Sequence, residues 1–340
     1  MKADKGVINW LFTGCILVFV MVVVGGITRL TGSGLSMTDW HLVTDTFPPL
    51  SDAAWQTAFE EYKKFPEYQR INSHFTLADY KFIYFWEWFH RFIARILGFV
   101  FLIPFIYFLI QKRMTQRTVF QCMILLGMGA FQGFLGWFMV KSGLIDFNQP
   151  DVSHFRLSLH LTFAFLTFAY TLWIALDLKY QGISERIAPL GKIALWTWVL
   201  VVVQIIWGGF VAGLDAGYIH NHWPLMSDGQ FFHDSICLEK PNWLLRFTEG
   251  KSGVQFIHRT LAYVVVGFIV YLAIKSRKYA LSTTQKKGIT ALLVVVFVQV
   301  TLGIFTLLYS VPLWLGVTHQ AVAFFLLAAI TFTMHRLRKA

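Results

Sequence analysis

Residues 90–110 read HRFIARILGFVFLIPFIYFLI, and no charged residue follows Arg95 in this run. A helix of about 20 apolar residues is long enough to cross the hydrocarbon core of a bilayer. Runs of similar length recur at about 8–30, 118–141, 155–177, 190–212, 256–275, 287–309 and 314–335. The sequence therefore predicts an all-α polytopic membrane protein with eight transmembrane helices.

Composition supports this class. The chain has 340 residues, of which 56% are hydrophobic and only 14% charged, whereas soluble domains carry about 25% charged residues. The formal net charge of +11 does not indicate a nucleic-acid partner, because the basic residues lie in short loops between apolar runs. We expect contact with a lipid bilayer and no nucleic-acid binding.

The basic loops all fall on one side of the predicted topology. They lie around Lys112–Arg113–Arg117, Lys179–Arg186–Lys192 and Lys275–Lys287, and at the termini with Lys2, Lys5, Arg336, Arg338 and Lys339. By the positive-inside rule this side is the cytoplasm, so both termini are expected there and the long loops 31–89 and 213–255 face outward.

The first apolar run is longer than a signal-peptide core, has no A-x-A cleavage site and follows only a few residues, which favours a bacterial plasma membrane. The three cysteines, Cys15, Cys122 and Cys237, form no CxxC motif and predict neither a disulfide framework nor a thiolate metal site.

The chain repeats itself. Gly25–Gly26, Gly34, Trp40 and Leu42 recur in the same order and spacing as Gly208–Gly209, Gly217, Trp223 and Leu225. In the same way FHRFIA at 89–94 matches IHRTLA at 257–262, Gln132, Leu135 and Gly136 match Gln299, Leu302 and Gly303, and LHLTFAF at 159–165 matches THQAVAF at 318–324. We predict two pseudo-symmetric four-helix halves, 1–180 and 181–340, with the same orientation.

Four of the eleven histidines occupy matched places in the repeat: His90, His160, His258 and His319. Each is expected in the first turn or two of an even-numbered helix, near the outer face. A single histidine in a span is more often a hydrogen-bonded packing residue than a ligand. Two matched pairs instead suit bis-histidine ligation of haem iron in a helical bundle, so the pattern favours two haem sites.

Each histidine is followed four positions later by an alanine: Ala94, Ala164, Ala262 and Ala323. Positions i and i+4 share a helix face, so a small residue there would leave room for a flat macrocycle.

Arg91 and Arg259 directly follow two of the histidines and could pair with haem propionates. The alternative is that they anchor the helices at the membrane interface. Arg29 and Arg156, near the outer ends of spans, are further candidates for the same role.

The repeat breaks at one chemically important position. Glu87 lies three residues before His90, whereas Gln255 lies three residues before His258. A glutamate can move a proton or hold a water and a glutamine cannot, so Glu87 marks the first half as the candidate reaction site. The alternative is an interfacial carboxylate paired with Arg91.

The sequence resembles the haem A synthase family over nearly its whole length, and specifically the branch without a cysteine pair in the first outer loop. The resemblance is carried by GGITRLTGSGLSMTDW at 25–40, EWFHR at 87–91, SGL at 142–144, VSHFRLSLH at 152–160, GGFVAGLDAGYIHNHWPLM at 208–226, FIHRTLAY at 256–263 and THQ at 318–320.

The resemblance implies an oxidoreductase that converts the C8 methyl of haem O to a formyl group, giving haem A for terminal cytochrome oxidase. Two successive hydroxylations would give a gem-diol that loses water. Carried over by motif, the residues are Glu87 for catalysis, His90, His160 and Arg91 for the substrate haem, and His258, His319 and Arg259 for a haem b cofactor. Implied partners are a haem O synthase and an electron acceptor that the sequence does not identify; a homo-oligomer is compatible with it.

Two other functions use the same histidines. A di-haem b cytochrome that only transfers electrons across the membrane would not require Glu87. A transporter with an internal repeat would use the histidines as proton relays and would bind no haem.

We predict that alkaline phosphatase fused after Ala340 is inactive and that green fluorescent protein fused there is fluorescent, because the C-terminus is cytoplasmic. Phosphatase inserted after Asp228 serves as the control and should be active. An active phosphatase at the C-terminus would contradict the predicted orientation.

Overall fold

The computed structural model describes residues 4–37, 46–145, 151–180 and 187–338, in which every regular element is a helix. Eight helices are long and apolar enough to cross a membrane, which confirms the predicted fold class. They are α1 (Lys5–Leu30), α4 (Leu77–Ile110), α5 (Gln116–Ile145), α6 (His154–Lys179), α7 (Ala188–Gly213), α10 (Lys251–Ser276), α11 (Thr283–Leu308) and α12 (Leu313–Leu337).

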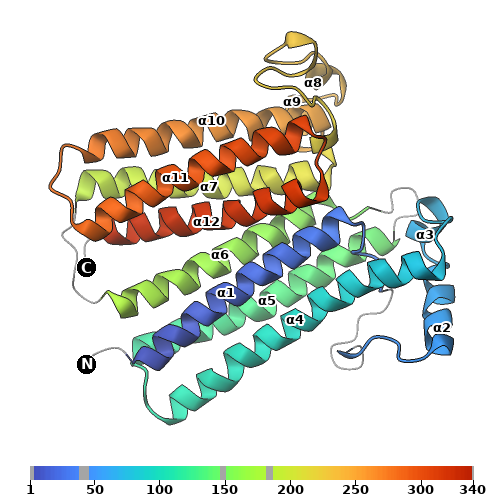
Figure 1. Cartoon of the computed structure of the whole chain (residues 1–340), viewed down its shortest axis with the longest axis horizontal. Coiled ribbons are helices and arrows are strands. Elements are labelled where there is room, and N and C mark those ends of the chain that lie inside the picture. The colour runs from blue at the N-terminus through green and yellow to red at the C-terminus, as the bar shows by residue number, and fades with distance from the viewer. Residues whose placement is uncertain (1–3, 38–45, 146–150, 181–186, 339–340) are drawn as a thin grey trace.

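The spans form two four-helix bundles that lie side by side (Figure 1). In the first, α1 packs on α4, α4 on α5, α5 on α6 and α6 on α1; α7, α10, α11 and α12 follow the same cycle in the second. Helices α4 and α6 therefore lie diagonally opposite each other in the first bundle, as α10 and α12 do in the second. The first four spans thus form one bundle and the last four the other, in agreement with the sequence repeat. The division into domains 1–180 and 181–340 stays a prediction.

The bundles meet through α1, α6, α7 and α12, where small residues allow close approach. A Cβ on Gly26 would lie 3.0 Å from Oε1 of Gln320, and a Cβ on Gly209 would lie 2.7 Å from Oγ of Ser158. Gln320 donates a hydrogen bond from Nε2 to the carbonyl oxygen of Val22, at 2.7 Å. A polar side chain at this interface thus bonds the backbone of the other half, as a buried polar group in a membrane protein must.

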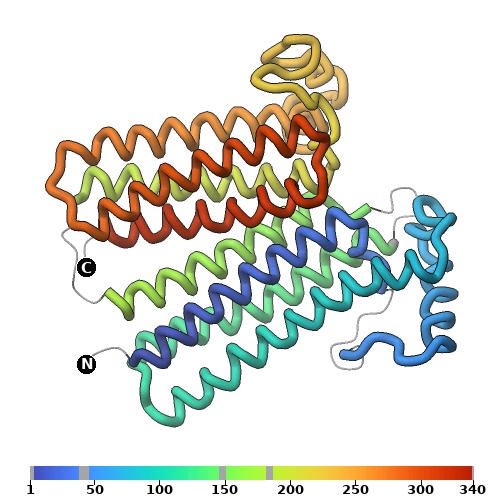
Figure 2. The backbone as a smooth tube through the Cα atoms, in the orientation of Figure 1, coloured from blue at the N-terminus to red at the C-terminus, as the bar shows by residue number. Residues whose placement is uncertain are grey.

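A charged cluster joins the halves at the end of the molecule where α1 begins and α12 ends; Figure 2 shows these two helix ends on the same side of the molecule. Asp177 of α6 lies 2.9 Å from Nε2 of His335 and 3.5 Å from Arg117, and it also pairs with Arg338. The described helix ends place both termini at this end of the molecule. Lys2, Arg186 and Lys339, which contributed to the predicted orientation, lie outside the described residues.

Helix α4 is longer than the sequence predicted. We expected it to begin near His90, but it begins at Leu77 behind a capping box, in which the Thr76 hydroxyl accepts from the Asp79 backbone and the Asp79 carboxylate accepts from the Thr76 backbone. The expectation that His90 lies in the first turns of its helix is therefore wrong. Tyr80 and Tyr84 of the added turns pack in an aromatic cluster with residues of the first outer loop, whereas Phe82 and Phe85 are exposed.

The outer loops carry short helices that the sequence analysis did not predict. They are α2 (Asp52–Tyr62), α3 (Pro66–Arg70), α8 (Ser235–Leu238), α9 (Trp243–Thr248) and the 3₁₀ turns η2 (Ala216–Tyr218) and η3 (Ser227–Gly229). Helices α2 and α3 with the first turns of α4 form what we call the first cap, whose core contains the buried Phe59, Tyr62 and Tyr80.

A carboxyl group is buried in the first cap. Glu67 is only 7% exposed and accepts a hydrogen bond from the Tyr62 hydroxyl at 2.8 Å; Asn72 in turn donates to that hydroxyl at 2.9 Å. Burial raises the pKa of Glu67 to about 8, because the charged form loses its hydration. Glu67 is therefore mostly protonated at neutral pH.

We predict that the first cap loses stability as pH rises from about 4.5 to 8. Over this range the unfolded carboxyl ionises while the folded one stays protonated, so the folded state binds more protons. One unit of pKa corresponds to about 1.4 kcal/mol. Hydrogen exchange of peptides from 52–80, corrected for intrinsic rates, should show more opening at pH 8 than at pH 5.

The Glu67→Gln variant should show nearly flat protection across this pH range, since its side chain does not ionise. Glu61→Gln, which changes an exposed carboxylate of α2, is the matched control and should behave like wild type. Equal pH dependence in wild type and Glu67→Gln would contradict the assignment.

Candidate functional site

The four span histidines meet in two pairs. His90 on α4 lies near His160 on α6 across the first bundle, and His258 on α10 lies near His319 on α12 across the second. All four are half-buried. Two imidazoles from diagonally opposite helices are the arrangement that axial ligation of a haem in a bundle requires.

Each imidazole lies against a glycine of the preceding span in the chain. A Cβ added to the glycine would lie close to the histidine Cε1: Gly25 to His90 at 3.1 Å, Gly136 to His160 at 3.2 Å, Gly208 to His258 at 3.2 Å, and Gly303 to His319 at 2.9 Å. The repeat is thus finer than two halves. The repeated unit is a hairpin of two consecutive spans, the first with the glycine and the second with the histidine. It occurs four times, as α1 with α4, α5 with α6, α7 with α10, and α11 with α12.

Three of the hairpins add a glutamine four residues before the glycine. The amide nitrogen of each glutamine lies at similar distances from both ring nitrogens, Nδ1 and Nε2. These distances are 3.1 and 3.5 Å for Gln132 and His160, 3.2 and 3.4 Å for Gln204 and His258, and 3.4 Å to both for Gln299 and His319. Gln132 and Gln204 also donate to the backbone oxygen of their histidine. The amide groups of Gln132 and Gln204 therefore contact both the imidazole ring and the backbone of the same histidine.

Buried polar atoms without partners indicate that the sites fit a haem. They include Nδ1 of His90 and the Oε1 atoms of Gln132, Gln204 and Gln299. An imidazole that binds iron through Nε2 carries a proton on Nδ1; in this structure the amide nitrogen of each glutamine, and not its oxygen, lies beside the ring. Within the described ranges, no three His, Cys, Asp or Glu side chains converge as a bare-metal site.

The alanines one turn after the histidines have different surroundings. Ala94 is exposed and the other three are half-buried. Ala164 and Ala323 pack against the central apolar cluster. Their predicted contact with a macrocycle stays a prediction.

Glu87 is buried and bonded through both oxygens. Oε1 lies 2.6 Å from Nη2 of Arg91, and Oε2 accepts from the Ser36 hydroxyl at 2.7 Å and from the Met37 backbone nitrogen at 2.9 Å. The structure thus contains the Arg91 pair that was the alternative interpretation of Glu87. The carboxylate also fixes the segment after α1 beside the turn of α4 that carries His90.

Gln255 has the opposite hydrogen-bond polarity. Its Nε2 donates to the carbonyl oxygens of Ala216 and Ile219, whereas Glu87 accepts from the loop it contacts. Gln255 therefore differs from Glu87 in its hydrogen bonds as well as in its charge. The loop in the first half presents a backbone N–H to Glu87, whereas the loop in the second half presents carbonyl oxygens to Gln255.

The arginines hold the outer loops. Arg259 donates from Nη2 to the carbonyl oxygens of His222, Pro224 and Leu225 at 2.9–3.0 Å. Arg91 donates to the carbonyl oxygen of Met37 besides pairing with Glu87. Their predicted contact with propionates stays a prediction.

The two further arginines have other partners. Arg29 pairs with Asp215 at 2.9 Å and so links the halves. Arg156 donates to the carbonyl oxygen of Phe138 and lies 3.8 Å from the centre of the Phe138 ring.

Comparison with known proteins identifies the family. Residues 8–331 match the family model described as cytochrome oxidase assembly protein. A protein named heme A synthase from Flavobacterium psychrophilum is 71% identical over the full length of both chains. The chain belongs to the haem A synthase family. The predicted family membership is confirmed.

More distant members of the family also match at full length. The heme A synthase of Flavobacterium johnsoniae is 66% identical over 99% of both chains. That of Nitrosospira multiformis is 42% identical over 99% of this chain and 94% of its own. The arrangement of spans described here therefore belongs to an enzyme family with wide sequence divergence.

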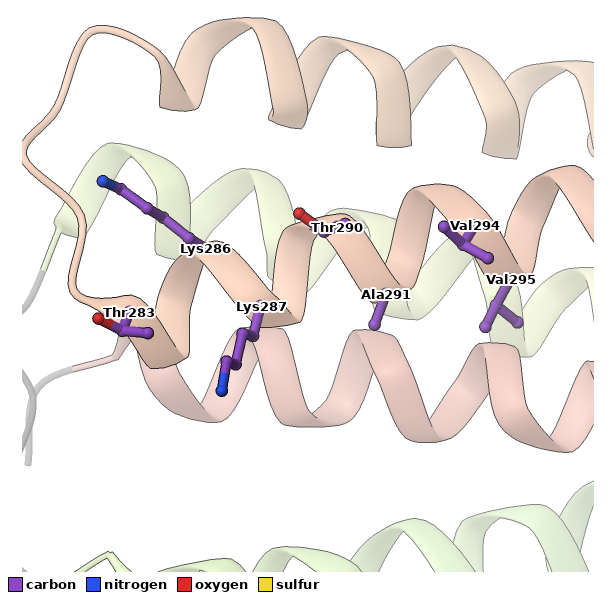
Figure 3. Close-up of a pocket in the computed structure, with 7 residues that line it drawn as sticks. All are labelled: Thr283, Lys286, Lys287, Thr290, Ala291, Val294 and Val295. Atoms are coloured by element: carbon purple, nitrogen blue, oxygen red, sulfur yellow. The ribbon is translucent and has the colours of Figure 1, made fainter.

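A groove elsewhere on the molecule is separate from the histidines. It runs along the first half of α11 and is lined by Thr283, Lys286, Lys287, Thr290, Ala291, Val294 and Val295 (Figure 3). None of the candidate site residues lines it. Its lining comes from a single helix, so it is a surface feature of α11.

Sequence reasoning missed several parts of the site. It used Gln132 and Gln299 only as markers of the repeat and did not connect them, or Gln204, to the histidines. The four-residue spacing from each glutamine to a glycine was the available signal. It also did not discuss Arg95, half-buried one turn deeper on α4 than Arg91, where the second half has Tyr263. Trp40 and Leu42 of the repeat lie outside the described residues.

We predict that Gly303→Ala weakens haem binding in the second half, because the added methyl lies 2.9 Å from the His319 ring. Overpacking of this kind costs about 1–3 kcal/mol, or roughly 5- to 150-fold in affinity. The haem content and absorption spectrum of the purified protein measure this effect.

Gly267→Ala on α10 is the matched control, because its methyl would meet no atom within 4 Å. Alanine favours helix over glycine by up to about 1 kcal/mol, so this variant should keep its haem. Identical haem content in both variants would show that the Gly303 contact does not position His319.

Proposed function

We propose that this membrane enzyme of the haem A synthase family oxidises the C8 methyl of haem O to a formyl group and so supplies haem A to cytochrome oxidase. The observation that carries the proposal is the unequal pair of sites. Both bundles contain two facing histidines, but among the described residues only the first has a buried carboxylate, Glu87, one turn from a histidine.

We assign the substrate haem to His90 and His160, and a haem b cofactor to His258 and His319. The asymmetry at Glu87 and Gln255 supports this order, since proton transfer is needed only where the substrate reacts. Haem b, when bound, would supply a one-electron acceptor within the same molecule. The terminal electron acceptor is a separate partner, and a haem O synthase would deliver the substrate.

The reaction releases protons as well as electrons. Conversion of a methyl to a formyl group removes four electrons and, with water as the oxygen source, releases four protons. Ser36 donates a hydrogen bond to Oε2 of Glu87, so this hydroxyl offers a path by which a proton can reach the carboxylate. Arg91 donates to Oε1 and so holds the carboxylate in one orientation while Oε2 accepts the proton.

A di-haem electron-transfer cytochrome is the second function to distinguish. It would use the same four histidines but would not alter its haems. Co-expression with a haem O synthase, followed by extraction and chromatography of bound haems, separates the two. Haem b with haem O or A supports the proposal, haem b alone supports the cytochrome, and no haem would contradict both.

We predict that Glu87→Gln retains haem b but loses most haem A formation, by about 100-fold or more if Glu87 acts as a general base. The substitution also removes the carboxylate that pairs with Arg91, and removing one member of a buried ion pair is itself destabilising by about 3–5 kcal/mol. Haem A output must therefore be compared with the second-half haem b content, which reports folding.

The double variant Glu87→Gln with Arg91→Gln separates these effects. If the carboxylate takes part in the reaction, the double variant should fold and bind haem b yet stay inactive. Recovery of haem A formation in the double variant would show that Glu87 serves only to neutralise Arg91.

A further inference from the structure

The loop that carries α8 and α9 lies beside the first turns of α10, on the side away from the first bundle (Figure 1). Both short helices contact α10 and each other. The first cap is placed differently, because α2 and α3 lie beyond the ends of α1 and α5 (Figure 1). We call residues 231–248 the lateral segment. A segment beside the end of a span, and not beyond it, lies at the depth of the membrane–water interface.

The lateral segment exposes large apolar side chains. Leu238 is 82% exposed, Trp243 71% and Leu244 54%. Phe231 and Phe232 are also exposed, so all five lie between residues 231 and 244. Single exposed apolar residues are common on proteins, whereas a group of them marks a surface that contacts a partner or a membrane.

The polar side chains of this region lie on its inner side. Ser252, at the start of α10, is buried. Its hydroxyl accepts a hydrogen bond from the Ser235 hydroxyl at 2.8 Å and donates one to Glu239. Nε2 of His220 lies 2.9 Å from the same hydroxyl. The polar groups are therefore bonded to one another inside the loop, while the large apolar groups face outward.

Helix α2 of the first cap has the reverse arrangement. Its exposed Glu60 pairs with Lys63 at 2.7 Å, and its aromatic residues Phe59 and Tyr62 are buried. Charged groups outside and aromatic groups inside are typical of a surface that faces water. Apolar groups outside and bonded polar groups inside indicate that the lateral segment faces an apolar medium.

The apolar surface of the lateral segment continues that of α10. The rings of Phe231 and Phe232 pack on Phe256, with 5.5 and 5.1 Å between ring centroids. Tyr263 and Ile274 follow Phe256 at helical spacing on the same face of α10, and both are exposed. Exposed apolar side chains along a membrane span contact the acyl chains of lipid. The lipid-facing stripe of α10 therefore extends onto the lateral segment.

We propose that the lateral segment docks on the lipid bilayer, with Leu238, Trp243 and Leu244 inserted at the headgroup level of the leaflet at this end of the spans. Tryptophan is enriched at this depth, because its ring is apolar and its N–H is polar. Arg259, next to His258, binds the carbonyl groups of residues 222–225 earlier in the same loop. The loop is thus held by the second bundle at one point and by lipid at another. The inference does not depend on which haem either half binds.

A native cysteine provides the probe for the test. Cys237 on α8 directly precedes Leu238 and is exposed, whereas Cys15 and Cys122 are buried. A bimane label on Cys237 of the full-length protein therefore reports on the lateral segment. The matched control is Cys237→Ser/Glu60→Cys, which moves the label to the exposed face of α2. Cys237→Ser alone should take up no label.

The labelled proteins are compared as single copies in nanodiscs of phosphatidylethanolamine and phosphatidylglycerol. We expect lipid with a nitroxide near its headgroup to quench the label at position 237 more than the label at position 60. A nitroxide near the end of the acyl chain should quench it less. Aqueous iodide should show the opposite order, quenching position 60 more than position 237.

The variant Leu238→Ser/Trp243→Ser/Leu244→Ser tests the anchoring side chains. It should lower lipid quenching of the label on Cys237 and raise iodide quenching, and because these side chains are exposed the thermal unfolding temperature should not fall. Unchanged quenching in this variant would overturn the assignment of the anchor. In the wild-type chain, a label at position 237 that iodide quenches as strongly as at position 60, or that neither quencher reaches, would overturn lipid docking; the second result would indicate a protein partner.

Discussion

The close contact between an imidazole ring and a glycine backbone sets the geometry of this molecule. It occurs once in every hairpin of spans, and any side chain on the glycine would meet the ring at about the closest distance that carbon atoms allow. In three of the four hairpins the turn before the glycine also presents a glutamine amide to the same ring. The position of each histidine, and hence the room left for a ligand across the bundle, depends on it.

The function is found in the departures from this common plan. Glutamate replaces glutamine at position 87, methionine replaces glutamine at position 21, and arginine replaces tyrosine at position 95. All three departures are in the first bundle and lie within about two turns of His90 or its glycine. At the equivalent positions the second bundle has Gln255, Gln204 and Tyr263.

The sequence was sufficient for features that depend on local periodicity. The eight spans, the fold class and the matched histidines follow from apolar runs and from the repeat, and the family follows from motifs. Features that depend on contacts distant in the chain were not predictable. Glu87 is bonded by Ser36 and Met37, about 50 residues away, and no pattern near either segment indicates that they meet. The outward extension of α4 was missed because Tyr80 and Tyr84 pack on a cap that only the tertiary fold creates.

The adjacent glycines of α1 and α7 have one more consequence. Gly25 faces the ring of His90, while Gly26 faces Gln320 of the other half; Gly208 and Gly209 likewise face His258 and Ser158. Gln320 directly follows His319 in the chain, so one turn of α12 contacts both the Gly303 backbone of its own bundle and the Val22 backbone of the other. The packing of a half around its histidine and the packing of the two halves against each other are therefore set by the same helical turns.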